Sequence, residues 1–525
     1  MLRRLALAAL AGGSLSLAFE PVAVPYVVPL CLAGYALATR GLRVRSGFLV
    51  GLVFGVAFYF PHIWWMSESI GWPAWVLLAS VEAFFYGLLG GASPVLQRLR
   101  AWPAWLAFGW VAMECVRTTW PFSGMPWGRL GFAVVDTPVA PALAWLGTNG
   151  VSLLLAGLGF LLARVAVAER GAERLAAGTS LVGLAAVAVA PTFVPWTLPT
   201  TGQVDVAAVQ GNVPGRGNDV LYDVEQLTRN HVDVTLDLAE QVDAGDAVRP
   251  DFVVWPENST ARDPFSDATI YADISRAVEA IGVPVMVGGI VDGGPDHVLN
   301  QGIVWDPRTG PGERYAKRHP VAFGEYIPFR DRLPESLVQS GQLARIPRDM
   351  LSGTRATPLD VGGVLVADAI CFDVGYDDGF EEQVAGGAEL LVVQTSNASF
   401  IFTDQVEQQF AITRARAIES GRWLVVASTN GIAGIIAPDG SVLDRTERLT
   451  QDLVQGTVDL KSGMTPGLRV GTSMGTVAPA ITLVGLAWGI ILGWRARRRA
   501  RHDREDGGES VTPSPTAHRP EDVHA

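Results

Sequence analysis

Long apolar segments fill the first 195 residues of this chain and recur once near its end. A helix needs about 20 mostly apolar residues to cross a bilayer. Eight segments approach this requirement: residues 5–19, 22–39, 47–61, 73–95, 102–119, 138–163, 176–194 and 477–494. The sequence therefore predicts a polytopic α-helical membrane domain, with seven transmembrane helices in residues 1–195 and an eighth at 477–494. A fully soluble enzyme is excluded, because only 18% of the residues are charged, against about 25% in soluble domains.

Arginine is distributed unequally between alternate loops, which predicts the orientation of the chain because cytoplasmic loops are enriched in Lys and Arg. One side holds Arg117 and Arg129, and the other holds ten arginines: Arg3, Arg4, Arg40, Arg43, Arg45, Arg98, Arg100, Arg164, Arg170 and Arg174. We expect the side with ten arginines, and with it both termini, to be cytoplasmic. Residues 200–470 would then lie on the extracytoplasmic side, and the eighth helix would lead back to the arginines at 495–499.

The two ends of the chain need separate interpretation. Segment 5–19 follows Arg3 and Arg4 and also fits a secretory signal peptide. We expect it to be retained, because a second apolar run follows directly after Glu20-Pro21; cleavage would leave seven spans and the large domain still outside. Residues 495–525 lack apolar periodicity and are expected to form a disordered cytoplasmic tail.

Some polar and aromatic residues stand out within the membrane part. Loops 61–65 and 120–127 are rich in Trp and are predicted at the outer face. Trp commonly anchors a protein at the membrane interface, so an aromatic belt is favoured over a lipid-accepting rim. Glu82 and Glu114 lie inside apolar segments, where a carboxylate usually faces a cavity or a partner.

Residues 200–470 have the pattern of an ordinary α/β domain. Short apolar runs typical of strands occur at 203–209, 251–255, 284–291, 364–370, 389–395 and 423–428. Helical patterns occur between them, at about 222–243, 267–281 and 404–420. This alternation predicts central sheets covered by helices.

Three reactive side chains follow predicted strands of this domain. Glu257 follows the strand at 251–255, Cys371 follows the strand at 364–370, and Lys317 follows a further strand near 302–305. Ligands in α/β folds gather at the carboxyl ends of strands. Lysine is otherwise present only at Lys461. A lysine at 317 in a chain that uses arginine elsewhere suggests a need for an amine that can lose its proton.

Acyl transfer requires side chains of these three types. A carboxylate can take the proton of a cysteine thiol, and the resulting thiolate attacks a carbonyl carbon. A lysine ammonium stabilises the oxyanion that then develops. Each residue alone fits a packing or surface role better, and only the combination favours catalysis. The formal net charge of −12, without a basic groove, argues against a nucleic-acid partner.

The segments around these residues resemble the signature blocks of the nitrilase superfamily. The blocks are Val254–Glu257, Tyr315–Pro328 and Ala369–Asp373, with further similarity at Gln210–Asn212 and Arg416–Gly421. The resemblance implies an αββα sandwich in which Glu257 is the general base, Lys317 the oxyanion stabiliser and Cys371 the nucleophile. It also implies supporting roles for Glu325, Phe372 and Asp373.

The membrane part is similar to one branch of that superfamily, the apolipoprotein N-acyltransferases, at Trp110–Arg117 and Gly147–Ser152. This resemblance implies a multi-pass protein of the bacterial cytoplasmic membrane. It implies transfer of a fatty acyl group from a phospholipid, through a cysteine thioester, to a diacylated apolipoprotein, without metal or cofactor. A membrane-bound amidase that passes the acyl group to water, and a non-catalytic scaffold, are the alternatives; the retained Glu, Lys and Cys disfavour the scaffold.

Overall fold

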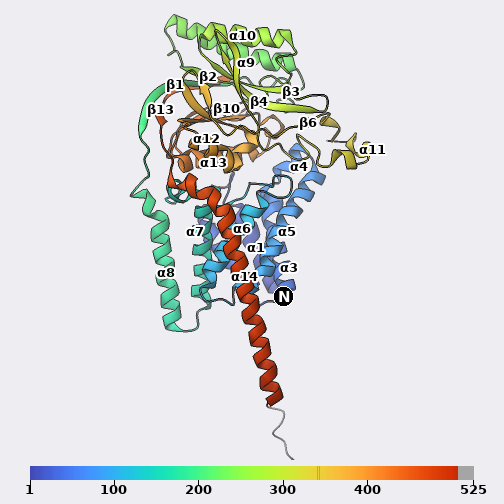
Figure 1. Ribbon diagram of the computed structural model, residues 1–525, viewed down its shortest axis with the longest axis vertical. Coiled ribbons are helices and arrows are strands. Elements are labelled where there is room, and N and C mark those ends of the chain that lie inside the picture. The colour runs from blue at the N-terminus through green and yellow to red at the C-terminus, as the bar shows by residue number, and fades with distance from the viewer. Residues whose placement is uncertain (340, 342, 507–525) are drawn as a thin grey trace, which may run out of the picture.

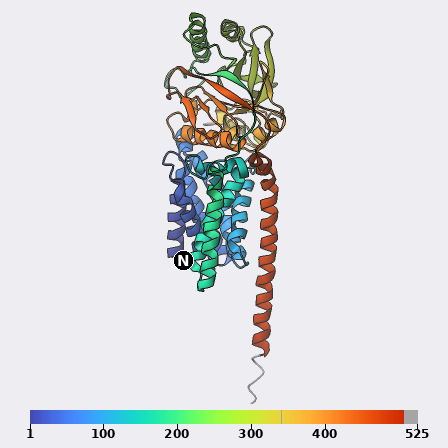
Figure 2. The same cartoon turned by 90° about the vertical axis from the view of Figure 1, so that its left-hand side faces the viewer.

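The computed structural model describes residues 1–339, 341 and 343–506 and has two stacked parts. A helical bundle made by the N-terminal part of the chain lies against one face of an α/β domain, as Figures 1 and 2 show. The last helix, α14, starts beside the α/β domain, runs along the bundle and extends past it (Figure 1). The N-terminus lies at the end of the bundle that is far from the α/β domain.

Each predicted membrane segment coincides with a helix. These helices are α1 (Leu2–Ser16), α2 (Val28–Thr39), α3 (Val44–His62), α5 (Trp72–Leu96), α6 (Trp102–Arg117), α7 (Ala142–Val167), α8 (Gly171–Val189) and α14 (Pro466–Asp506). Among the described residues, five helices are long and apolar enough to cross a membrane: Val44–His62, Trp72–Leu96, Ala142–Val167, Gly171–Thr192 and Pro466–Arg499. Helices α1, α2 and α6 are shorter, and the eight-span topology stays a prediction.

Helix α14 differs from the predicted eighth span at both ends. It begins at Pro466, inside the predicted outer domain, because its first turns pack on that domain: Leu468 belongs to the same apolar core as α13. It also continues through residues 495–506, where a disordered tail was expected. Arginine and alanine favour helix, and no Gly or Pro occurs between Arg495 and Gly507. The remainder of the predicted tail, 507–525, lies outside the described residues.

The structure supplies partners for both carboxylates inside the bundle. Glu82 forms an ion pair with Arg117, with Oε2 and Nη1 3.4 Å apart. Glu114 Oε1 accepts hydrogen bonds of 3.0 Å from the Trp110 indole and from the backbone N–H of Leu130. Arg117 also donates to the carbonyl oxygens of two residues in the 118–129 loop. Both carboxylates therefore hold the loop beneath the α/β domain in place.

Two sheets form the centre of the α/β domain. The first has the strand order β13-β1-β2-β3-β4-β5, with β6 paired to β4, and the second has the order β12-β11-β10-β9-β8-β7. The first sheet contains β1 (Thr200–Gln210), β2 (Phe252–Val254), β3 (Val285–Asp292), β4 (His297–Asp306), β5 (Gly310–Ala316), β6 (Asp349–Met350) and β13 (Asp452–Lys461). The second contains β7 (Leu359–Val361), β8 (Val364–Ile370), β9 (Leu390–Thr395), β10 (Leu424–Ser428), β11 (Gly434–Ile436) and β12 (Val442–Arg445). All six strands predicted as separate apolar runs are confirmed.

Helices cover the outer face of each sheet. Helices α9 (Val224–Ala244) and α10 (Ala268–Ile281) pack on the first sheet, away from the bundle (Figure 1). Helices α12 (Asp378–Ala385) and α13 (Gln405–Ser420) pack on the second sheet, between it and the bundle. Apolar side chains of both sheets meet in a shared core. The predicted αββα sandwich is confirmed.

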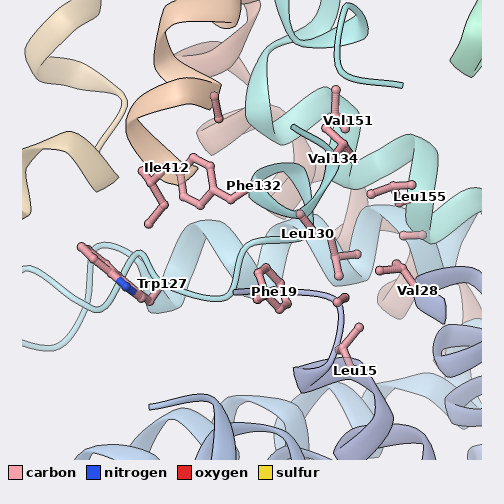
Figure 3. Packing of buried hydrophobic residues seen from close by; sticks show 14 of the residues in the cluster. Leu15, Phe19, Val28, Trp127, Leu130, Phe132, Val134, Val151, Leu155 and Ile412 are labelled. Carbon is pink, nitrogen blue, oxygen red and sulfur yellow. The ribbon is translucent and has the colours of Figure 1, made fainter. Parts of the chain in front are cut away.

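A single apolar core joins the bundle to the α/β domain. Figure 3 shows Leu15 and Phe19 from the first helix and its loop together with Phe132 from the 118–141 segment and Ile412 from α13. The same cluster reaches Val393 in β9. Burial of apolar surface is the main favourable term in folding, so the two parts of the chain stabilise each other.

Charged side chains complete this junction. Arg129 of the membrane part and Arg416 of α13 both pair with Asp377, with N–O distances of 2.8 and 2.9 Å. Thr148 donates from its N–H and its hydroxyl to Glu419 Oε1, at 2.7 and 3.0 Å. The sequence blocks at 147–152 and 416–421 therefore meet at the interface between the two parts.

We expect Asp377→Ala to destabilise the docking of the α/β domain on the bundle. Removing this carboxylate leaves two buried guanidinium groups short of a counter-charge, which costs about 3 kcal/mol. A lower thermal unfolding midpoint in detergent and faster proteolysis between the two parts would report the loss.

The matched control is Asp136→Ala, which removes an exposed partner of Arg414 at the same interface. Exposed ion pairs contribute less than about 1 kcal/mol. Equal destabilisation by both variants would show that the Asp377 network is not what holds the two parts together.

Candidate active site

Glu257 lies at the end of β2, where Trp255 and Pro256 carry the chain out of the sheet. Its Oε1 accepts hydrogen bonds from Lys317 Nζ at 3.1 Å and Asn300 Nδ2 at 2.7 Å. Its Oε2 accepts one from the backbone N–H of Ser396 at 2.9 Å. The side chain is buried, and these bonds fix the carboxylate in one orientation.

Lys317 directly follows β5, and its side chain is 1% exposed. Besides the contact with Glu257, its Nζ donates to Glu325 Oε1 at 2.6 Å. The second oxygen of Glu325 accepts from the backbone N–H of Val321 at 2.8 Å. A buried ammonium needs counter-charges, and two carboxylates supply them here.

Cys371 occupies the turn between β8 and the short 3₁₀ helix η6 (Cys371–Gly375). Its φ is +53°, in the left-handed region that residues other than glycine rarely adopt. Strained backbone of this kind often presents a nucleophile at a sharp strand-to-helix turn. Glu257 and Lys317 are buried, whereas the residue Cys371 is only partly buried.

The charges of these groups influence one another. Burial raises the pKa of the Cys371 thiol to about 12, with the Glu257 carboxylate adding to this effect and the Lys317 ammonium opposing it. Burial alone would lower the pKa of Lys317, but Glu257 and Glu325 outweigh it and hold the pKa well above its usual value. At neutral pH the site therefore holds a protonated thiol, which needs a base, beside a permanent positive charge.

Asp373 joins the lysine segment to the cysteine segment. Its Oδ1 accepts from the backbone N–H of His319 at 2.8 Å. Its Oδ2 accepts from the N–H of Arg318 and from the Tyr315 hydroxyl, each at 3.1 Å. The short aspartate side chain reaches all three donors and holds residues 315–319 against the turn that carries Cys371.

Phe372 connects the site to the membrane part. Its ring stacks on Trp127, with centroids 5.1 Å apart and planes 13° apart. Trp127 lies in the loop between α6 and α7, so the residue next to Cys371 packs directly on a membrane-domain loop.

The tryptophans of the two outer loops have different environments. Trp64 and Trp120 are 52% and 62% exposed, as expected for interfacial anchors. Trp65 is buried instead, where its indole donates to Gln408 of α13 at 2.9 Å, and Trp127 is buried beneath Phe372. The interpretation of both loops as an aromatic belt alone is therefore wrong for Trp65 and Trp127, because the α/β domain covers them.

Three further partners at the site were missed by the sequence reasoning: Asn300, Thr395 and Ser396. Asn300 and Ser396 bind Glu257, and the Thr395 hydroxyl hydrogen-bonds the Cys371 side chain. Thr395 is the last residue of β9, which pairs with β8, and Ser396 follows it directly; that position was the available signal. Within the described part of the chain, no group of three or more His, Cys, Asp or Glu side chains could hold a metal ion.

Two parts of the chain match known families. Residues 205–464 match the family described as carbon-nitrogen hydrolase. Residues 11–161 match the family described as apolipoprotein N-acyltransferase N-terminal domain. Fold and site thus define a nitrilase-type α/β domain carried on a bundle of apolar helices.

Whole-length relatives specify the family further. The apolipoprotein N-acyltransferase of Mycolicibacterium smegmatis is 35% identical, over 91% of this chain and 84% of that protein. That of Ralstonia nicotianae is 31% identical, over 94% of this chain and 93% of that protein. The chain belongs to the apolipoprotein N-acyltransferase family.

Among solved structures, a mutant of an amidase from Nesterenkonia sp. AN1 is 17% identical over 52% of this chain and 95% of that chain, with a TM-score of 0.37.

We expect Lys317→Arg to reduce acyl transfer strongly although the charge is kept. A planar guanidinium is wider than an ammonium and does not fit between Glu257 and Glu325. Lys317 is the expected oxyanion stabiliser, and losing a preorganised oxyanion donor costs about 10²–10³ in kcat. The rate of acyl transfer by the purified variant measures this effect.

Lys461→Arg is the matched control, because Lys461 forms a peripheral ion pair with Asp459 that arginine can also make. Similar rates in the two variants would mean that Lys317 is a structural charge.

We expect Glu257→Gln to separate thiol acidity from catalysis. Glu257 raises the pKa of Cys371, so removing its charge should move the alkylation of Cys371 by iodoacetamide to lower pH. Acyl transfer should nevertheless fall by about 10²–10⁴, because Glu257 is the expected general base. Mass spectrometry of the Cys371 peptide across a pH series measures the pH midpoint of its alkylation.

Glu279→Gln, an exposed position on α10, is the control. An unchanged or higher pH midpoint in Glu257→Gln would contradict the assignment.

Proposed function

We propose that this protein transfers a fatty acyl group from a phospholipid to the N-terminal amine of a diacylglyceryl-cysteine lipoprotein. The carrying observation is the position of Cys371: a partly buried cysteine beside a buried Glu-Lys pair, next to the face of the membrane-helix bundle. Membership of the apolipoprotein N-acyltransferase family supports the same reaction. The phospholipid is the donor, and the diacylated apolipoprotein is the acceptor.

The first half-reaction would form a thioester. Glu257 takes the proton of the Cys371 thiol, and the thiolate attacks the ester carbonyl of the phospholipid. Lys317 stabilises the oxyanion of the tetrahedral intermediate. The intermediate then expels the lysophospholipid alkoxide, which receives the proton from Glu257.

The second half-reaction would form an amide. The free amine of the lipoprotein attacks the thioester, and Glu257 accepts a proton from the attacking nitrogen. Lys317 stabilises the second oxyanion. Collapse releases the N-acylated lipoprotein, and the cysteine sulfur regains its proton from Glu257.

Three neighbouring residues would support these steps. Glu325 holds Lys317 in place through the contact at 2.6 Å. Asp373 anchors the lysine segment through backbone N–H groups. Phe372, stacked on Trp127, shapes the side of the site that faces the membrane part.

Transfer to an amine is favoured over hydrolysis by the membrane part. A tethered amidase would need no more than one helix, whereas this chain matches the acyltransferase N-terminal family over residues 11–161. Two lipid-anchored substrates account for a catalytic domain docked on a large helical bundle.

We further propose that the protein resides in the bacterial cytoplasmic membrane, with the α/β domain on the extracytoplasmic side and both termini in the cytoplasm. The ten-to-two arginine distribution supports this orientation. The N-terminus and the far end of α14 lie on the side of the bundle away from the α/β domain (Figure 1), as this topology requires.

Incubation with phospholipid and a diacylated lipopeptide should yield a triacylated peptide, and Cys371→Ala should abolish both this product and the acyl-enzyme adduct. Mass spectrometry before and after hydroxylamine identifies the thioester. Cys31→Ala and Cys115→Ala should keep the adduct, since both thiols are buried in the bundle. Release of free fatty acid without triacylated peptide would identify a hydrolase instead.

Labelling in spheroplasts tests the orientation. With Cys31, Cys115 and Cys371 replaced by Ala, Asp237→Cys, at an exposed position of α9, should react with a membrane-impermeant maleimide in intact spheroplasts. Arg43→Cys in the same background should react only after lysis. The reverse pattern would show an inverted topology.

A further inference from the structure

Asp368 is a buried carboxyl group that the proposed mechanism does not use. It lies on β8, three residues before Cys371, and is 0% exposed. Within the described residues neither of its carboxyl oxygens makes a hydrogen bond of good geometry, and the adjacent backbone N–H of Ala369 offers only a weak one. Burying an ionised carboxylate without a partner is very costly, so the state of this group requires an explanation.

Gln394 on the neighbouring strand β9 shows the complementary feature. Its Nε2 donates to the carbonyl oxygens of Trp255 and Met286, at 2.6 and 3.4 Å, across the space between the two sheets. Its Oε1 has no partner among the described residues. Because both carbonyl oxygens can only accept, the amide cannot be turned round, and Oε1 must point away from them.

The two unpartnered groups face the same point. Gln394 pairs in register with Ile370, and side chains alternate along a strand, so Asp368 and Gln394 project from the same face of the second sheet. A Cβ on Gly302 of β4 would lie 2.3 Å from Asp368 Oδ2 and 2.2 Å from Gln394 Oε1. The absence of a side chain at Gly302 leaves the room in which the two oxygens converge.

A protonated carboxyl group can donate where a carboxylate can only accept, so one proton on Asp368 would satisfy both oxygens. We propose that Asp368 is a neutral carboxylic acid whose O–H donates to Gln394 Oε1, and that it acts as a positioning residue for the active site. Burial, with the nearby Asp373 charge adding to it, raises the pKa of Asp368 well above its usual value, which agrees with this assignment.

The hydrogen bond would connect the strands that carry the two reacting groups. Asp368 lies on the strand that ends at Cys371, and Trp255, whose carbonyl Gln394 binds, precedes Glu257 by two residues. The proton on Asp368 fixes the Gln394 amide in the orientation that bridges the sheets. This consequence for catalysis rests on the proposed Glu-Lys-Cys site, whereas the protonation itself does not.

Infrared difference spectroscopy of the full-length protein tests the protonation directly. The spectrum of the wild-type protein minus that of Asp368→Asn should contain the carbonyl band of a protonated carboxylic acid at neutral pH. Asp237→Asn, at an exposed position of α9, should not remove this band. The same band should persist in Cys371→Ala, so a failure of the proposed function would not be mistaken for a failure of this inference.

The rate of thioester formation in two variants of Asp368 tests the positioning role. Asp368→Asn offers an amide N–H to Gln394 and should form the thioester within about threefold of the wild-type rate, whereas Asp368→Leu offers none and should be slower by about tenfold or more. Absence of the acid band, or an Asn variant as slow as the Leu variant, would overturn the proposal. The presence of the acid band in the difference spectrum, together with a near-wild-type rate of thioester formation in Asp368→Asn, would establish it.

Discussion

The buried ammonium of Lys317 is the charge on which the geometry of the candidate site depends. Two carboxylates, Glu257 and Glu325, lie within hydrogen-bonding distance of it, and without it they would repel each other in a region that excludes water. Desolvation of such groups is expensive, and direct contact between opposite charges offsets it only when the geometry is close. Lys317 therefore links the segment after β5 to the segment after β2, and Asn300, which bonds to both Glu257 and the Lys317 backbone, provides a second link.

The turn that carries Cys371 is fixed at both of its ends by different means. On one side, Asp373 binds backbone N–H groups of the lysine segment. On the other, Asp377 pairs with Arg129 from the membrane part and with Arg416 from α13. Contacts that reach from the end of β5 in the first sheet to the helical bundle therefore hold Cys371 and its uncommon φ angle in place.

Local patterns in the sequence predicted an α/β domain with helix-covered sheets and three reactive residues at strand ends. The αββα sandwich was implied by the resemblance to the nitrilase superfamily. Sequence reasoning did not predict Asn300 or Thr395, since their roles arise from strand pairing that only the folded sheets define. The short strands β11 and β12 and the edge strand β13 were missed for the same reason. The extension of α14 was missed because its first turns pack on the α/β domain and lack a long apolar run.

The partners of the membrane carboxylates were also beyond sequence reasoning. Glu82 could be recognised as unusual, but Arg117 was counted only as a loop charge on the outer side. The tertiary contact shows that this arginine is buried and bonded to the loop that carries Trp127. Counting arginines in loops gives each of them the same weight, whereas in the folded protein Arg117 has a specific buried position and specific partners.

The continuous apolar core between the bundle and α13 makes the α/β domain different from a module on a tether. Val393 and Ile412 of that domain belong to the same cluster as Leu15 and Phe19 of the first helix region. Excising residues 200–470 would expose this face to water, and a contiguous apolar patch on a soluble protein promotes aggregation. The α/β domain and the helical bundle thus form one folding unit. The α/β domain stays free of aggregation only while the bundle covers its apolar face.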